Sequence, residues 1–282
     1  MADLRIFDRV EDVSKLVGCN TRNVEYRWTI FHDNLGSLPV GSNVLDFGAG
    51  SLRDSYELAV RGYNITSVDL DEKLLSSYSV EYEWPSNGTK RRLVSEAKPT
   101  DSLAKLSGEK FSLITCFDVL EHLDDPVPVL KLLRSHMTPD GKMFVTVPNG
   151  RTLFELALRV DLVIARATKR RLRPGEPHLQ RNSPGKWVRL IERAGLKVVA
   201  HDMQIGVLVN TAFALVQLPI LLCCRLLRRF GINFNGTEIA SRICNGARMS
   251  ALDRLDQASK PMLRGLYGWN LFVVSQGDRA DS

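Results

Sequence analysis

The glycine-rich segment at residues 44–50 (VLDFGAG) has the residue types of a cofactor-binding loop. An apolar run ends near Asp46, and two glycines, Gly48 and Gly50, stand on either side of Ala49. Glycine lets the backbone turn tightly and approach a ligand closely. An apolar strand, a glycine-rich turn and a helix in this order predict a nucleotide-type site at the carboxyl end of a parallel sheet.

Two further residues narrow the kind of cofactor. Asp69 ends the next apolar run, where its carboxylate can accept hydrogen bonds from both hydroxyls of a ribose. Leu52 replaces the third glycine of a dinucleotide fingerprint, which argues against a pyrophosphate on the helix N-terminus. The pattern favours a cofactor without phosphates, whose amino-acid end lies beside the loop. An ordinary strand-to-helix turn is the alternative.

A second group of reactive side chains, Asp118, Glu121 and His122, follows the apolar run 111–117 (FSLITCF). If this stretch is helical, the three side chains share a face because they are three and four positions apart. Two carboxylates and an imidazole can then hold a divalent metal ion. His122 can instead act as a general base toward a hydroxyl. A purely structural role, with a capping aspartate and a packed Glu-His pair, is the third interpretation.

The surrounding pattern predicts strands alternating with helices, which would bring these groups to one edge of a sheet. The strands read as nearly continuous apolar runs, as is typical of a mostly parallel sheet covered on both faces. The expected strands are 43–47, 64–70, 91–96, 111–117, 142–148, 196–201 and 268–275. The expected helices are 52–61, one from about 72, 127–136 and 184–194, with Gly62 and Gly195 as C-cap glycines and Ser183 as an N-cap.

Composition sets broad limits on the class of protein. The chain has 282 residues, 44% of them hydrophobic, and a formal net charge of +6, which suits one large core and mildly favours anionic partners. The five cysteines have no CxxC spacing, so they predict idle thiols in a reducing compartment. The first residues (MADLRIFDRVEDV) carry acids where a signal peptide needs an apolar run, so we expect a cytoplasmic protein.

The chain resembles the class I S-adenosylmethionine-dependent methyltransferases in segments that follow one another in the same order. They are VLDFGAG, VDLDEKLL, FSLITCFDVLEHLDDPVPVLKLL, MTPDGKMFVTVPNG and HLQRNSPGKWVRLIERAGLKVV. The resemblance covers residues 40–202 and 268–275. It implies a Rossmann-like, seven-stranded, mostly parallel α/β sheet with helices on both faces and an antiparallel last strand.

The same resemblance implies a division of the chain and a cofactor site. The divisions are a helical N-terminal cap (1–40), a cofactor-binding core (41–204), a helical apolar insertion (205–264) and the last core strand with the tail (265–282). The implied cofactor is S-adenosyl-L-methionine, and the residues expected around it are Asp46, Gly48, Ala49, Gly50, Asp69, Leu70 and Asp118. An acid after the third strand, Glu96 or Asp101, would reach the adenine amine.

The pattern DVLEH at 118–122 is similar to the ExxEH of polyprenyl-hydroxyphenol (ubiquinone pathway) O-methyltransferases and of small-RNA 2′-O-methyltransferases. In those families the pattern carries a metal. The similarity implies His122 as the catalytic residue or, alternatively, Asp118, Glu121 and His122 as metal ligands. Asp118 replaces the first glutamate, and its shorter side chain reaches less far.

Residues 203–224 contain no charged side chain and could in principle span a bilayer core of roughly 30 Å. A crossing is disfavoured because Pro219 interrupts the run and because the last strand has to return to the sheet. The segment is therefore expected to form a lid, an oligomer contact or a helix in the membrane interface. Flanking basic residues at 169–173 and 225–229 favour contact of residues 203–229 with a membrane surface.

The leading hypothesis is S-adenosylmethionine-dependent O-methylation of a hydroxyl on a small or lipid-linked acceptor. RNA methylation is an alternative, although nucleic acid is not the expected partner because the basic clusters lack interleaved aromatic residues that would stack bases. A non-catalytic scaffold with the methyltransferase fold is the third hypothesis, and Leu52 in the loop is its only support.

Overall fold

The computed structural model describes residues 38–81, 84–85, 90–153, 178–204, 247–263 and 266–276, with scattered positions in 155–163 and 206–223. Most of the expected N-terminal cap and the basic residues at 169–173 and 225–229 therefore lie outside the described residues. By compactness the chain divides into two units. Unit 1 comprises residues 1–30, 148–177 and 203–269, and unit 2 comprises 31–147, 178–202 and 270–282.

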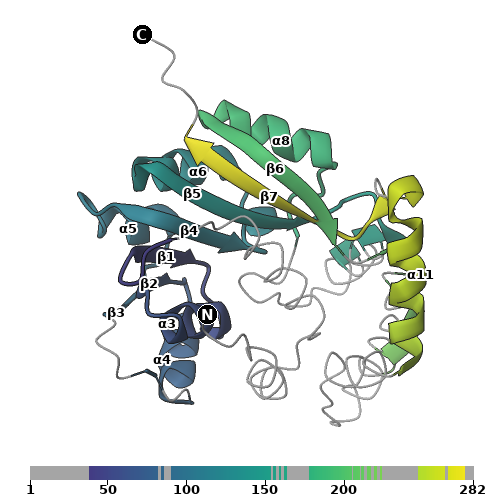
Figure 1. Ribbon diagram of the computed structural model, residues 1–282, viewed down its shortest axis with the longest axis horizontal. Helices are drawn as coiled ribbons and strands as arrows, with labels where there is room; N and C mark the ends of the chain where they lie inside the picture. The colour runs from purple at the N-terminus through teal and green to yellow at the C-terminus, as the bar shows by residue number, and fades with distance from the viewer. Residues whose placement is uncertain are drawn as a thin grey trace. The chain divides into compact units, whose positions relative to one another are not determined.

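A seven-stranded sheet forms the centre of the fold (Figure 1). Its strands are β1 (Asn43–Phe47), β2 (Asn64–Val68), β3 (Arg91–Val94), β4 (Phe111–Phe117), β5 (Met137–Pro148), β6 (Leu196–Gln204) and β7 (Trp269–Gln276). The strands lie in the order β3-β2-β1-β4-β5-β7-β6, with β1 to β5 paired in parallel and β7 antiparallel. The predicted Rossmann-like sheet and its antiparallel last strand are confirmed.

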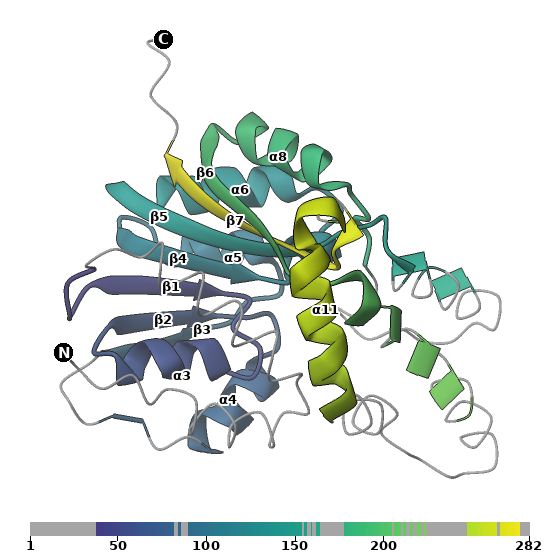
Figure 2. The same ribbon diagram turned by 45° about the vertical axis from the view of Figure 1, so that its right-hand side comes forward.

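Helices cover both faces of this sheet. They are α3 (Arg53–Val60), α4 (Glu72–Glu81), α5 (Pro99–Ala104), α6 (Pro126–Ser135) and α8 (Pro184–Arg193), with the 3-10 helix η1 (Leu120–His122) after β4. Helices α5, α6 and α8 lie in a row on one face, and α3 lies on the other (Figure 2). The row of helices buries one continuous core with the sheet, in which Trp187 and Ile191 of α8 and Leu130 and Leu133 of α6 are fully buried.

Two differences from the sequence expectation have local causes. Strand β5 begins at Met137, five residues before the expected start at Lys142, because Pro139 to Gly141 form an irregularity inside the strand rather than a turn before it. The register passes from Phe111↔Met137 to Leu113↔Lys142 across this irregularity. Helix α5 was not expected from the sequence, and it spans only six residues.

The capping residues agree with the expectation in part. Gly62 and Gly195 have φ values of 91° and 76°, so both C-cap glycines are confirmed in the left-handed conformation. Ser183 is the residue before α8, but its side chain makes no capping hydrogen bond.

In unit 1, helix α11 (Ala247–Leu263) is joined to the start of the apolar segment by a buried carboxylate. The side chain of Asp256 accepts hydrogen bonds from the N–H groups of Leu208 and Val209, at 2.9 and 2.8 Å. A Cβ on Gly206 would lie 2.0 Å from the carboxyl carbon of Asp256. Asp256 therefore caps the first turn of the helical stretch at 207–209, and Gly206 must remain a glycine for it to do so.

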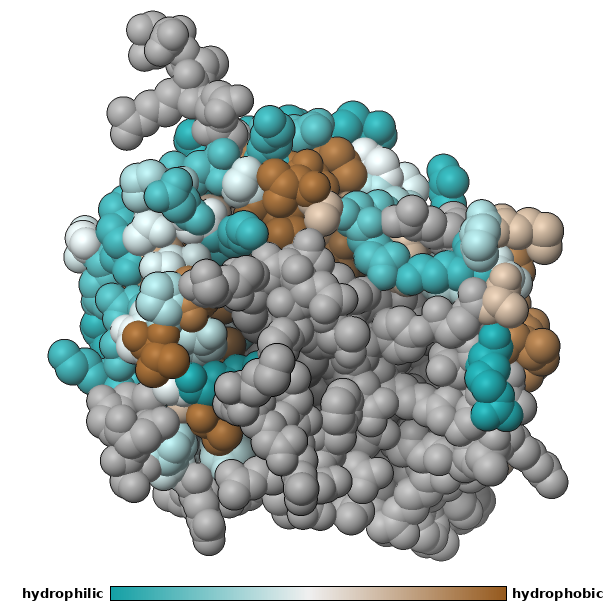
Figure 3. Space-filling view, viewed as in Figure 1, coloured by the Kyte–Doolittle hydropathy of each residue, from teal (hydrophilic) through white to brown (hydrophobic). Residues whose placement is uncertain are grey.

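Among the described residues, most of the strongly exposed apolar side chains belong to unit 1. Figure 3 shows that hydrophilic residues cover much of the described surface on one side of the molecule, with separate hydrophobic patches among them. The large apolar residues of unit 1 that are at least 40% exposed are Leu153, Leu156, Val163, Leu208, Leu215, Leu255, Met262 and Leu266. Among the described residues, no helix has the length and apolar character needed to cross a bilayer.

Helix α3 begins at a leucine in a strained conformation. Leu52 is its N-cap residue, with φ 59° and ψ 12°, and it provides no side-chain capping bond. The left-handed region costs an L-residue about 1–2 kcal/mol. The side chain of Leu52 is fully buried, and burial of a leucine contributes about 1.5–3 kcal/mol. Packing of the side chain therefore balances or outweighs the backbone strain.

We expect Leu52→Gly to be less destabilising than Leu52→Ala by about 1 kcal/mol, because both remove the buried side chain but only glycine relieves the left-handed strain. Denaturant unfolding measures this difference. The matched control is Leu58, which is equally buried but lies within α3, where alanine should be more stable than glycine by about 1 kcal/mol. The same order of stability at both positions would contradict the strain argument.

Candidate functional site

The loop after β1 is held against the end of β2. The N–H groups of Gly48 and Ala49 both donate to the main-chain oxygen of Val68, at 2.8 and 2.9 Å. Gly48 has a φ of 79°, and a Cβ built on it would lie 2.1 Å from Cγ2 of Val119. Position 48 therefore requires glycine, and the loop is in direct contact with the turn after β4.

The other side of the loop is tied to the predicted ribose acid. The N–H of Gly50 donates to Oδ2 of Asp69 at 2.8 Å, and Oδ1 of Asp69 accepts from the N–H of Asp71 at 3.0 Å. A Cβ on Gly50 would meet nothing closer than the oxygen of Gly48 at 4.0 Å, so the space beside it is open. Leu70 is 47% exposed. Open space beside a carboxylate and an exposed apolar side chain fits the cofactor that the sequence implies.

Asp46 lies in a buried row of polar side chains. In the sheet register it is level with Ser67 on β2 and with Thr115 on β4. The hydroxyl of Thr115 donates to Oδ1 of Asp46 at 2.7 Å, and the hydroxyl of Ser55 on α3 donates to Oδ2 at 2.5 Å. Because Ser55 uses its proton on Asp46, the hydroxyl of Ser67, 2.7 Å away, donates to Ser55. Both oxygens of the Asp46 carboxylate are thus engaged within the fold.

This environment changes the acidity of Asp46. Burial of the carboxylate and, to a smaller extent, the charge of Asp54 together raise the pKa of Asp46 from 3.8 to about 6, although the hydrogen bonds from Ser55 and Thr115 act in the opposite direction. Removal of the carboxylate from water therefore raises the pKa of Asp46 by more than the hydrogen bonds from the two hydroxyls lower it.

The turn after β4 begins with a second residue in the left-handed region. Asp118 has a φ of 56°, and its N–H donates to the main-chain oxygen and to Oγ1 of Thr146, at 3.0 and 3.1 Å. The hydroxyl of Thr146 donates back to Oδ1 of Asp118 at 2.8 Å. Asp118 thus precedes η1 in a turn, and the helical face expected for residues 118, 121 and 122 does not form.

The structure instead groups Glu121 and His122 with His178. The carboxylate and ring-nitrogen atoms of the three residues lie within 4.8 Å of one another. Nε2 of His122 is 4.0 Å from Oε1 of Glu121, whose side chain is 1% exposed. The rings of His122 and His178 meet edge to face, with centroids 4.9 Å apart. Two imidazoles and one carboxylate form a donor set that suits zinc and other divalent first-row ions.

Sequence reasoning did not connect His178 with this group. The residue stands just before α8, far along the chain from η1, and no spacing rule joins the two positions. The available signal was topological. Helix α8 connects to β6, and β6 is expected to run parallel to β4. A helix before a parallel strand runs in the opposite direction to that strand, so the segment that precedes α8 must lie at the edge of the sheet where β4 ends.

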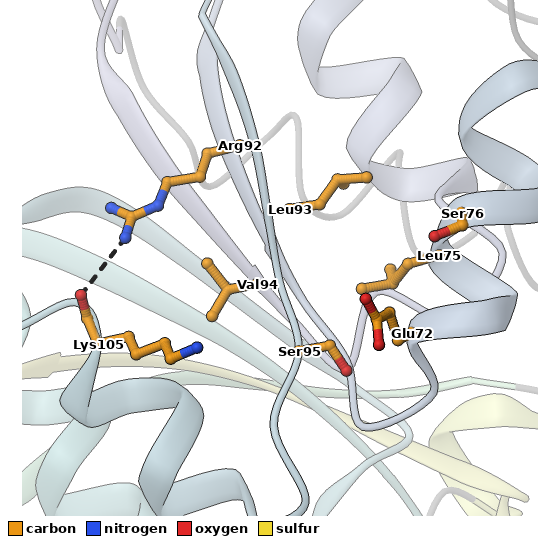
Figure 4. A pocket seen from close by; sticks show the side chains of 8 residues that line it. All are labelled: Glu72, Leu75, Ser76, Arg92, Leu93, Val94, Ser95 and Lys105. Carbon is orange, nitrogen blue, oxygen red and sulfur yellow. Dashed lines mark hydrogen bonds between the residues drawn. The ribbon is translucent and has the colours of Figure 1, made fainter.

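A separate cavity of about 360 Å³ lies at the edge strand β3 (Figure 4). It is lined by Glu72, Leu75, Ser76, Arg92, Leu93, Val94, Ser95 and Lys105. Its two cations are already paired, Arg92 with Glu109 and Lys105 with Glu96. The predicted cofactor residues do not line this cavity. Of the two acids considered for the adenine amine, Glu96 follows β3 and Asp101 lies in the first turn of α5.

Comparison with known proteins assigns the family. The family model described as a methyltransferase domain matches residues 21–201, and the chain belongs to this family. It is a class I S-adenosylmethionine-dependent methyltransferase, and S-adenosylmethionine is its cofactor.

The relatives are distant. The chain is 29% identical over 168 residues to a ubiquinone biosynthesis O-methyltransferase of Pseudomonas putida (strain W619). The matched region covers 56% of this chain and 66% of the relative. A protein of the same name from Pseudomonas syringae pv. tomato is 30% identical over 154 residues, with coverages of 51% and 58%. The chain thus spans less than two thirds of the length of these relatives.

A solved structure shares the fold. A putative sarcosine dimethylglycine methyltransferase from Galdieria sulphuraria superposes with a TM-score of 0.55 at 15% identity, over 91% of this chain and 86% of the other.

We expect Asp46→Asn to stabilise the protein at about pH 8 by up to roughly 3 kcal/mol, because one pKa unit corresponds to about 1.36 kcal/mol. The folded pKa of about 6 lies above the unfolded value of 3.8. The stability from the protonated carboxyl is therefore fully present below the unfolded pKa and is lost as the pH rises through about 6. The difference in the free energy of unfolding between Asp46→Asn and the wild type should therefore grow as the pH rises from 3.8 through about 6.

Denaturant unfolding at several pH values measures this gap. Asp140→Asn is the matched control, because Asp140 is exposed on β5, and its gap from wild type should stay near zero. A variant at position 46 that is less stable than wild type at high pH would mean that the two hydroxyl hydrogen bonds outweigh the burial cost.

Proposed function

We propose that this protein methylates a hydroxyl oxygen on a small or lipid-linked acceptor, and that Glu121, His122 and His178 activate that hydroxyl by holding a divalent cation. The observation that carries the proposal is the grouping of these three donors within 4.8 Å, at the turn where β4 ends. The resemblance to two proteins named ubiquinone biosynthesis O-methyltransferase supports oxygen as the methylated atom.

The cofactor half of the site is the loop at residues 48–50 with Asp69, Leu70 and Asp118. Bound S-adenosylmethionine supplies an electrophilic methyl group on a sulfonium. Gly48 and Gly50 let the backbone approach it, the Asp69 carboxylate accepts hydrogen bonds from ribose hydroxyls, and Leu70 offers an apolar surface to the adenosine. Methyl transfer is a single displacement, so the chief demand on the protein is alignment of donor and acceptor.

The acceptor half needs a way to remove the hydroxyl proton. A divalent cation on two imidazoles and a carboxylate would lower the pKa of a hydroxyl bound to it. The buried Glu121 carboxylate would supply negative charge to hold the cation, and the two histidines would orient it. The competing arrangement has no cation, and His122 takes the proton as a general base.

Exposed apolar residues support an acceptor with an apolar part. Leu179, which follows His178, is 39% exposed, and its N–H donates to the main-chain oxygen of Glu121 at 2.7 Å. An exposed apolar residue thus directly follows His178 in the chain, and its main chain contacts that of Glu121. The predicted contact of residues 203–229 with a membrane surface stays a prediction, because much of that range lies outside the described residues.

We expect Asp69→Ala to weaken binding of S-adenosylmethionine at least tenfold, because hydrogen bonds to a charged group contribute about 1.5–3 kcal/mol. Isothermal titration calorimetry measures the affinity. Asp71→Ala is the matched control, since Asp71 caps α4 through the N–H of Leu74 and should affect stability but not affinity. Unchanged affinity in Asp69→Ala would remove Asp69 from the cofactor site.

We expect the metal-free protein to bind Co²⁺, with a visible absorption band, and His178→Ala to weaken that binding tenfold or more. Methyl transfer from labelled S-adenosylmethionine to a prenylated dihydroxyphenol should fall in parallel. His201→Ala is the control, because His201 bonds to Asn270 outside the group of donors. Methyl transfer that needs no cation and is lost in His122→Ala, but not in His178→Ala, would favour the general-base arrangement.

A further inference from the structure

The segment that carries His178 is fastened to the turn after β4 by hydrogen bonds at both main chain and side chain. The N–H groups of Leu179 and Gln180 both donate to the main-chain oxygen of Glu121, at 2.7 and 2.9 Å. The side-chain Nε2 of Gln180 donates to the main-chain oxygen of Asp124 at 2.6 Å. We call residues 178–182 the strap.

The strap is also braced from its other end. Nδ2 of Asn182, a residue that is 3% exposed, donates to Oε1 of Gln180 at 3.2 Å. The next residue, Ser183, is the N-cap of α8, and α8 packs beside α6, which begins just after Asp124 and Asp125. The amide of Gln180 therefore joins the approaches to two neighbouring helices.

This bracing acts on the distance between the two histidines. Glu121 accepts the strap through its main chain and belongs to the donor group through its side chain. His178 is one residue before the first strap hydrogen bond. A shift of the strap along the turn would therefore move the His178 ring away from the His122 ring, whose centroid is 4.9 Å away.

We propose that Gln180 is a positioning residue that sets the place of His178 relative to Glu121 and His122. The inference rests on the proposed function for its consequence, which is cation affinity, but the positioning itself is a property of the metal-free protein. Groups that orient metal ligands from outside the ligand set typically contribute 10–100-fold to metal affinity.

The test uses two variants of the full chain, Gln180→Ala and Gln180→Glu. The glutamate keeps the size of the side chain but has no N–H to donate to Asp124, so both variants should behave alike. Gln276→Ala is the matched control, because Nε2 of Gln276 also donates to main-chain oxygens, those of Met137 and Thr138 at 3.0 and 3.1 Å, in another part of the sheet.

In the metal-free protein, we expect the imidazole NMR signals of His122 and His178 to shift in both Gln180 variants and to stay in place in Gln276→Ala. With Co²⁺ we expect affinity to fall tenfold or more in the Gln180 variants alone, while the KM for S-adenosylmethionine is unchanged. Histidine signals and Co²⁺ affinity equal to those of the wild type would overturn the inference and leave the proposed function intact.

Failure of the wild-type protein to bind Co²⁺ would have a different meaning. It would contradict the cation in the proposed function, and the histidine signals would then decide the inference by themselves. Shifted signals in both Gln180 variants would support positioning, and unshifted signals would exclude it.

Discussion

A side chain at position 48 would occupy the volume that Val119 fills, and this contact joins the two halves of the site. The loop after β1 supplies the expected cofactor surface, and the turn after β4 leads into Glu121 and His122. Because a Cβ on Gly48 would come within 2.1 Å of Val119, the two segments can lie together only when residue 48 is glycine. The distance between the loop after β1 and the turn after β4 therefore depends on the absence of a side chain at position 48.

Strain at two residues is compensated by their surroundings. Leu52 and Asp118 both adopt the left-handed conformation, each in a turn that follows a strand of the sheet. A buried side chain stabilises the first, and hydrogen bonds with Thr146 stabilise the second. Residues in such conformations persist only where the surrounding structure determines them, and they concentrate at functional sites.

The buried row of polar side chains around Asp46 also holds several elements together. It connects β1, β2, β4 and α3 through one carboxylate and three hydroxyls, next to the loop that follows β1. The raised pKa of Asp46 reflects the removal of its carboxylate from water. A fully satisfied polar network specifies one arrangement of these elements, which an apolar interior would not do as selectively.

The sequence by itself determined the sheet, the order of its strands and the glycine-rich loop after β1. Apolar runs such as 111–117 and glycines such as Gly62 report local conformation, and local conformation depends on neighbouring residues in the chain. The same information could not foresee the irregularity inside β5 or the left-handed Leu52, since tertiary packing outweighs local preference at both places.

Only the tertiary structure decided which residues form the candidate metal-binding group. The sequence proposed Asp118 with Glu121 and His122, on the assumption of a helix. The turn at Asp118, closed by Thr146 from β5, directs that carboxylate elsewhere, and the strap before α8 brings His178 to the group. Contacts of this kind join residues that are far apart along the chain, so they exist only after the sheet has brought the strand ends to one edge.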